Sequence, residues 1–157
     1  MFTLISSAYK NNERMPEKYA NMGVVGAENK NPPLKWEGAP VDTQSFAVVM
    51  VDHHPVANEF VHWLVINIPK DADSLPEGAS PHQMPGGAKE LNTTYQKPGY
   101  GGPRPPVGSG DHPYETIIYA LNIDDLSLDS NAGIAEFQDA IKGKILGQAG
   151  LTGLFSQ

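Results

Sequence analysis

The chain of 157 residues carries 18 acidic and 11 basic side chains, for a formal net charge of −7, and contains no cysteine. The negative charge excludes bulk electrostatic attraction to nucleic acid or anionic lipid surfaces, and the lack of cysteine excludes disulfides and thiolate metal sites. The length is that of one domain, and 16 Gly with 14 Pro favour short strands joined by shaped loops over a helical bundle. We therefore expect a single domain over residues 1–157.

Three segments have the composition of β-strands. Residues 45–52 form a short β-rich run that ends in an acidic side chain. Residues 60–69 are apolar at both parities, which is typical of a strand covered on both faces. Residues 115–123 form the third predicted strand, and shorter β segments are expected near residues 2–6 and 34–36. These segments predict a mainly β fold.

One helix is predicted late in the chain. Apolar side chains recur from Ile134 to Ile145 at spacings of three, four and four residues, after the capping candidates Ser130 and Asn131. The pattern predicts a helix over about residues 134–148, although two glycines weaken its last turns. Strands followed by one late helix favour a β-sandwich with helical decoration over a βαβ fold.

Residues 96–113 form a long loop that contains five Gly and five Pro. A loop of this length inside a compact domain is usually functional or disordered. Proline stiffens its backbone, and glycine permits a positive φ and the close approach of a ligand. We expect a shaped loop here, in which the run Pro103-Arg104-Pro105-Pro106 has a structural use rather than serving as a PxxP ligand.

The usual signatures of phosphate loops, dinucleotide folds, zinc proteases and serine hydrolases are absent. Four polar residues remain near the ends of the predicted strands: Asp52, His62, His112 and Tyr114. Taken singly, Asp52 is most simply a turn residue, and His62 is most simply a core histidine with a satisfied hydrogen bond. They form a site only if they converge beside the glycine- and proline-rich loop, which a linear sequence does not show.

Four motifs carry a resemblance to a known family. Residues 31–36, N-P-P-L-K-W, resemble S-P-P-L-x-W, and residues 52–55, D-H-H-P, resemble D-P-D-x-P. Residues 62–69, H-W-L-V-I-N-I-P, resemble H-W-V-V-x-N-I-P, and residues 99–114, G-Y-G-G-P-R-P-P-V-G-S-G-D-H-P-Y, resemble G-Y-x-G-P-x-P-P-x-G-x-G-x-H-R-Y. These are motifs of the phosphatidylethanolamine-binding protein family, which includes Raf kinase inhibitor protein. The chain is most similar to its bacterial and archaeal branch, nearly end to end.

The resemblance implies a β-sandwich of two antiparallel sheets with a C-terminal helix and a small anion-binding cavity at one end. By position, the cavity would be formed by Asp52, His62, Pro105, Pro106, Gly108, Gly110, His112 and Tyr114. Backbone N–H groups of the glycine-rich turn can form an anion nest, to which a protonated histidine adds a charged donor. Asp52 would orient or charge one imidazole, and Tyr114 would donate its hydroxyl. Phe60 and Trp63 are expected at the mouth of the cavity or in the core, the core being favoured for Trp63.

The chain departs from the family pattern at two places. His53 and His54 replace the Pro and the second Asp of D-P-D, and the segment that follows is one residue shorter than in close relatives. Pro113 replaces the Arg of H-R-Y, which removes a charge and a backbone donor. Both departures affect the rim of the implied cavity.

The resemblance implies a non-enzymatic binding or regulatory protein that uses neither metal nor cofactor and takes a small anion such as phosphate or phosphoethanolamine. Kinase inhibition is implied by the family name, but no residue here identifies a kinase surface. A cytoplasmic location and a homodimer are also expected, with no nucleic-acid partner and no integral membrane segment. The alternative is a metal-dependent enzyme or metalloprotein, in which Asp52, His62 and His112 form a two-histidine, one-carboxylate site.

Overall fold

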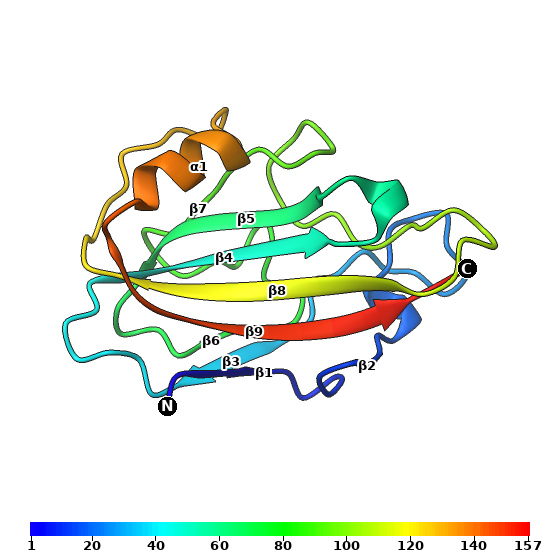
Figure 1. The fold of residues 1–157 in the computed structure, drawn as a ribbon, viewed down its shortest axis with the longest axis horizontal. Coiled ribbons are helices and arrows are strands. Elements are labelled where there is room, and N and C mark those ends of the chain that lie inside the picture. The colour runs from blue at the N-terminus through cyan, green and yellow to red at the C-terminus, as the bar shows by residue number, and fades with distance from the viewer.

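The computed structural model describes residues 1–157 as a sandwich of two β-sheets with one short helix (Figure 1). The larger sheet has the strand order β2 (Glu13–Arg14), β9 (Ile145–Phe155), β8 (His112–Leu121), β4 (Ser45–Asp52), β5 (Phe60–Pro69) and β7 (Lys89–Glu90). The smaller sheet has the order β1 (Thr3–Ile5), β3 (Leu34–Glu37) and β6 (Ser74–Leu75). All neighbouring strands are antiparallel except β2 and β9, which are parallel. The predicted β-sandwich is confirmed.

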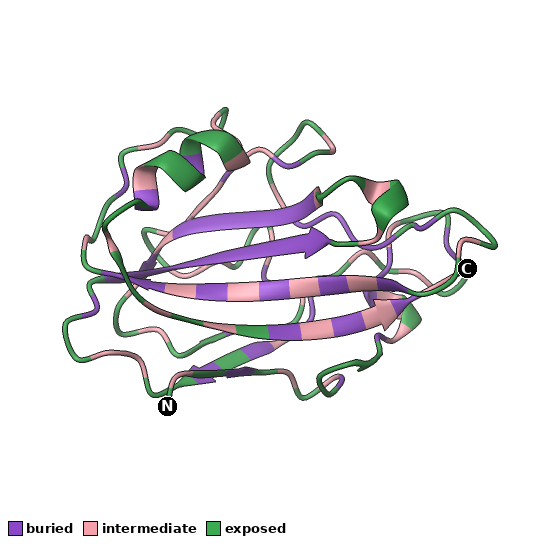
Figure 2. Cartoon of the chain, in the orientation of Figure 1, coloured by how far each residue is buried: buried purple, intermediate pink, exposed green.

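The central strands of the larger sheet are covered on both faces. Every residue of β4 is buried, and β5 is buried along most of its length (Figure 2). One face packs against the smaller sheet, through side chains such as Trp36 and Trp63. The other face packs against helix α1 (Ile134–Ile141), through side chains such as Leu64 and Phe137. This double cover explains why residues 60–69 are apolar at both parities.

The predicted strands 45–52 and 60–69 are confirmed as β4 and β5. The third predicted strand exists as β8, but it runs from His112 to Leu121 instead of over 115–123. The two short predicted segments near residues 2–6 and 34–36 correspond to β1 and β3.

The predicted helix over 134–148 is wrong in its second half. Helix α1 ends at Ile141, and the chain then reverses through Gly143, whose φ is +74°. From Ile145 onward it is a strand, β9, which pairs with β8 along almost its whole length. Positive φ is incompatible with a right-handed helix, so Gly143 ends the helix even though Ile145 continues its apolar spacing. No helix in the structure is both long enough and apolar enough to cross a bilayer.

Candidate functional site

The register of three neighbouring strands gathers the predicted site residues at one end of the larger sheet. Asp52, the last residue of β4, lies opposite Phe60 on β5 and Tyr114 on β8. His112 precedes Tyr114 by two positions, so both face the same side of the sheet. His62 lies at a β-bulge of β5 and lines the same cavity as Phe60. A cavity of about 270 Å³ opens there, lined by Asp52, Val56, Ala57, Phe60, His62, Tyr95, Arg104, Pro105, Pro106, His112 and Tyr114.

The structure brings most of the predicted site residues to this cavity, but not the glycines. Asp52, His62, Pro105, Pro106, His112 and Tyr114 line it, whereas Gly108 and Gly110 do not. The Gly108 amide donates to the Gln157 carbonyl at 3.0 Å and the Ser109 amide donates to the Pro106 carbonyl at 3.1 Å. The amides of Gly108 and Ser109 are therefore engaged within the protein. The two glycines shape the turn, each with a φ above +80°.

Asp52 and His112 form a buried pair at the base of the cavity. The Asp52 Oδ2 accepts a hydrogen bond from Nδ1 of His112 at 2.7 Å, and its Oδ1 accepts the backbone N–H of His54 at 2.9 Å. Nε2 of His112 lies 2.8 Å from the Ser109 hydroxyl oxygen. Both ring nitrogens of His112 thus have protein partners, and neither is free for a ligand. The sequence-based expectation that Asp52 orients an imidazole fits this geometry.

His62 does not carry the positive charge expected of a histidine that donates to an anion. Its Nδ1 lies 2.7 Å from the carbonyl oxygen of Gly101, which can only accept, so Nδ1 carries the proton. Burial lowers the pKa of His62 to about 4, outweighing the Gly101 hydrogen bond and the nearby Asp52 charge, which both act to raise it. The imidazole is therefore neutral near pH 7, and its Nε2 is a hydrogen-bond acceptor.

Tyr114 supplies an unused donor. Its side chain is fully buried, and its hydroxyl has no hydrogen-bond partner in the protein. Burial, reinforced by the negative charge of Asp52, raises the pKa of Tyr114 well above its ordinary value, so the hydroxyl keeps its proton. An unpartnered buried hydroxyl costs free energy.

The glycine- and proline-rich loop is held against the rest of the fold by hydrogen bonds from three sides. Gly101 donates its backbone N–H to the His62 carbonyl at 2.9 Å, and Asn21 donates its N–H to the Pro103 carbonyl at 2.9 Å. The Gln157 side chain donates to the Pro105 carbonyl at 2.7 Å. The loop is shaped, as its proline content predicts, and it forms one wall of the cavity.

Four residues that line the cavity were not predicted as site residues: Val56, Ala57, Tyr95 and Arg104. The Tyr95 ring packs edge-on against Phe60 and His62, with ring centroids 4.7 and 5.5 Å away. Arg104 lies inside one of the quoted motifs. It is the one cationic side chain between the prolines of that motif, and this feature could have identified it from the sequence. Phe60 lines the cavity and Trp63 is buried in the core.

The two histidines that replace residues of the family motif, His53 and His54, have different surroundings. His53 lies between two carboxylates, with Nδ1 2.9 Å from Glu59 Oε2 and Nε2 2.9 Å from Glu115 Oε1. Burial alone lowers the pKa of His53, but the two carboxylates outweigh it, and the net shift is upward. His54 turns the other way and stacks on the ring of His112.

The alternative metal site is not supported by this arrangement. No group of three or more His, Asp or Glu side chains in the structure is placed to hold a metal ion. His112 has both nitrogens engaged, Asp52 has both oxygens engaged, and His62 offers one nitrogen only. Asp52, His62 and His112 therefore do not form a ligand set.

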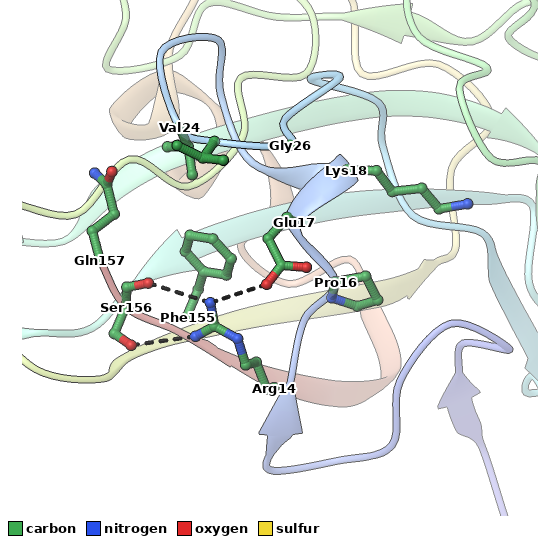
Figure 3. Close-up of a pocket in the computed structure, with 10 residues that line it drawn as sticks. Arg14, Pro16, Glu17, Lys18, Val24, Gly26, Phe155, Ser156 and Gln157 are labelled. Carbon is green, nitrogen blue, oxygen red and sulfur yellow. Dashed lines mark hydrogen bonds and ion pairs between the residues drawn. The ribbon is translucent and has the colours of Figure 1, made fainter.

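A larger hollow of about 750 Å³ lies beside β2, and Figure 3 shows why it is a weaker candidate. None of the predicted site residues lines it. The Arg14 guanidinium already bonds Glu17 and both oxygens of Ser156, and it stacks over the Phe155 ring at 4.5 Å. Lys18 is paired with Glu77. The cations of this hollow are thus neutralised by the protein itself.

Comparisons with known proteins agree with the motifs. Residues 5–156 match the family model described as phosphatidylethanolamine-binding protein. The chain is 32% identical to a UPF0098 protein of Aquifex aeolicus, over 98% of this chain and 88% of that protein. It is also 32% identical to the UPF0098 protein YbhB of Escherichia coli, over 98% of this chain and 99% of that protein.

A solved structure shares the whole architecture. The crystal structure of E. coli YbcL, described as a new member of the mammalian PEBP family, superposes with a TM-score of 0.92 at 29% sequence identity. The match covers 99% of this chain and 98% of YbcL. A phosphatidylethanolamine-binding protein from Plasmodium vivax, at 16% identity and a TM-score of 0.61, shares the fold.

Proposed function

The chain belongs to the phosphatidylethanolamine-binding protein family, and on this premise we propose that it is a non-enzymatic binding protein whose cavity takes a small phosphate-bearing ligand. The observation that carries the proposal is the cavity of about 270 Å³, whose lining includes Tyr114, a side chain with a buried hydroxyl that has no hydrogen-bond partner in the protein. A ligand oxygen would complete its hydrogen bonding. A cavity of this volume suits a headgroup-sized molecule.

The polar groups around the cavity are arranged for binding rather than for proton transfer. In the pair of Asp52 and His112, both ring nitrogens and both carboxylate oxygens have hydrogen-bond partners in the protein, and His62 stays neutral over the physiological pH range. The Ser109 hydroxyl, the only one that reaches a site histidine, does not line the cavity and lies 2.6 Å from the Pro106 carbonyl, to which it can donate.

Titration calorimetry with phosphoethanolamine tests this proposal directly. We expect saturable binding to the wild-type protein, and a loss of roughly tenfold or more in affinity in Tyr114→Phe, because a buried hydrogen bond to a charged ligand disappears. Tyr119→Phe is the matched control, since Tyr119 lies on the same strand but packs against Phe137 and α1, away from the cavity. Absence of binding to the wild type, or equal affinity in all three proteins, would overturn the proposal.

We further propose that the chain regulates a protein partner, forms a homodimer and resides in the cytoplasm. Light scattering on the purified chain measures its mass in solution and so tests the dimer. A pull-down compared between Phe60→Ala and wild type asks whether any partner depends on the cavity.

A further inference from the structure

We propose that Ser80 and Asn29 are positioning residues of the cavity: their side chains hold the backbone on either side of Gly101, whose carbonyl oxygen fixes the tautomer of His62. Neither side chain lines the cavity, and neither residue lies in the four sequence motifs described above. This inference rests on the proposed function, because His62 lines the cavity that we propose to take the ligand.

Gly101 and His62 are joined by two hydrogen bonds. The Gly101 amide donates to the His62 backbone carbonyl at 2.9 Å, and the Gly101 carbonyl accepts from Nδ1 of the imidazole at 2.7 Å. A carbonyl oxygen can only accept, so it selects the tautomer that carries its proton on Nδ1. Displacement of this carbonyl would remove the selection, because a neutral imidazole can carry its proton on either nitrogen. The groups that hold Gly101 therefore decide what His62 presents to the cavity.

The amides on both sides of Gly101 are bound by side chains from other segments of the chain. Tyr100 donates its N–H to the Ser80 hydroxyl oxygen at 2.9 Å. Gly102 donates its N–H to Oδ1 of Asn29 at 2.7 Å. Three consecutive amides are thus bound, the outer two by side chains and the middle one by strand β5. The two side chains hold the loop at the point where its carbonyl meets the imidazole.

The Ser80 hydroxyl is oriented by Glu90. Its oxygen lies 2.5 Å from Oε2 of Glu90, a carboxylate oxygen that can only accept, so the hydroxyl donates there and keeps a lone pair for the Tyr100 amide. The same Oε2 accepts the indole N–H of Trp63 at 2.7 Å. Trp63 follows His62 in β5, so Glu90 ties Ser80 to the strand that carries the imidazole.

The backbone on both sides of these contacts has the conformation and the space that they need. Asn29 has a φ of +53°, a left-handed conformation in which asparagine is enriched over other side chains. A Cβ at Gly101 would collide with the Tyr95 ring, and a Cβ at Gly102 would collide with the Tyr19 carbonyl oxygen. Glycine at both positions therefore lets the loop lie close enough to the rest of the fold to be held.

Nuclear magnetic resonance of the imidazole nitrogens at about pH 7, where His62 is neutral, tests the positioning role without a ligand. We expect the wild type to carry the His62 proton on Nδ1 alone, and the double variant Ser80→Ala with Asn29→Gly to show both tautomers. Glycine permits a positive φ, so Asn29→Gly removes the acceptor without straining the backbone. Ser80→Thr and Asn29→Asp keep an acceptor at each position and should retain the wild-type signals.

Ser45→Ala is the matched structural control. The Ser45 hydroxyl is also buried and donates to the Ile123 carbonyl at 2.5 Å, but Ser45 begins β4, whereas the cavity lies where that strand ends. This variant should lose stability without changing the tautomer of His62. A single tautomer in the folded double variant, or both tautomers in Ser45→Ala as well, would overturn the inference. The single variants Ser80→Ala and Asn29→Gly provide the same test if the double variant does not fold.

Titration of the same variants with phosphoethanolamine connects the tautomer to binding. Where only molecules with the proton on Nδ1 bind, the apparent affinity falls with the fraction that keeps this tautomer, so an equal mixture lowers it about twofold. An unchanged affinity in a variant with mixed tautomers would show that Ser80 and Asn29 do not position His62 for binding. Absence of binding to the wild type would overturn the proposed function, whereas the tautomers of the unliganded variants would still confirm or overturn the positioning of His62.

Discussion

The imidazole of His54 lies flat against that of His112, with ring centroids 3.9 Å apart and ring planes inclined by 8°. The two rings come from different elements, because His54 precedes the 3₁₀ turn η2 (Pro55–Ala57) and His112 begins β8. The same His54 side chain accepts the backbone N–H of Val56 at 3.1 Å. One side chain therefore caps a turn and covers the buried pair of His112 and Asp52.

Replacing His54 should reveal both contributions. We expect His54→Ala to lower the free energy of unfolding by about 1–2 kcal/mol, the sum of a lost ring stack and a lost turn cap. His54→Phe keeps a stacking ring and His54→Asn keeps a capping acceptor, so each should cost less than the alanine variant. Urea unfolding measures all three, and an alanine variant as stable as wild type would contradict the prediction.

Breaking the buried pair should be far more costly. Asp52→Ala leaves the His112 ring without its 2.7 Å acceptor in a fully buried position, and we expect a loss of about 3–5 kcal/mol. Asp111→Ala removes the same side chain at an exposed position one residue before His112, and it should change stability by no more than about 0.5 kcal/mol. Similar losses in the two variants, measured by denaturant unfolding, would show that the pair contributes little.

The lowered pKa of His62 predicts acid sensitivity. The unfolded chain takes up a proton at this residue near pH 6.5, but the folded chain does so only near pH 4, because burial lowers its pKa to about 4. Stability should therefore fall as the pH drops through this window, by up to about 3 kcal/mol from this residue. His62→Gln keeps a donor for the Gly101 carbonyl and does not titrate. The wild-type-minus-variant difference in unfolding free energy should follow this fall, and a flat difference would contradict it.

His53 should act with the opposite sign. Its pKa is raised in the folded state, because Glu59 and Glu115 outweigh the effect of burial. Its stabilisation is fully present below the unfolded pKa of 6.5 and is lost as the pH rises through the folded value. The effect is small, since the side chain is 37% exposed and its ion pairs are screened by water. Thermal melts of wild type and His53→Gln at about pH 6 and pH 8 should differ more at the lower pH. A difference that grows with pH would show the assigned direction to be wrong.

The hydrogen-bonded series of Ser109, His112 and Asp52 has the residue types of a serine hydrolase triad, which makes the non-enzymatic proposal easy to challenge. We expect no covalent labelling of Ser109 by a fluorophosphonate probe, because its hydroxyl can donate to the Pro106 carbonyl and the residue does not line the cavity. Intact-protein mass spectrometry reads the result. Labelling that disappears in Ser109→Ala would establish a reactive nucleophile.

Strand β5, which is buried along most of its length, was predicted from the sequence, whereas strand β9 was missed because close packing requires glycine in it. The apolar run of β5 requires cover on both faces, and the structure supplies it. Strand β9 carries Gly147, Gly150 and Gly153, which weaken any strand pattern. A Cβ at Gly153 would collide with Met15 and Tyr9, so glycine is required there by a contact that the linear sequence does not show.

The site was predictable from motifs but not from spacing. Asp52, His62 and Tyr114 come together because β4 pairs with β5 on one side and with β8 on the other, and the pairing with β8 joins residues about 60 positions apart. The charge state of His62 depends on burial and on the Gly101 carbonyl, and both are properties of the folded chain. Arg104 belonged to a recognised motif, but its freedom from ion pairs emerges only in three dimensions.

The pairing of Asp52 with Phe60 and Tyr114 also limits how this chain can change in length during evolution. The register passes from Val51 opposite Val61 to Met50 opposite Trp63, so His62 is the extra residue of a β-bulge in β5, and deleting one residue there would remove a side chain that lines the cavity. The turn over 53–59 lies outside this register. Val56 and Ala57 of that turn line the cavity, so a change in its length would alter the wall of the cavity and leave the bulge at His62 in place.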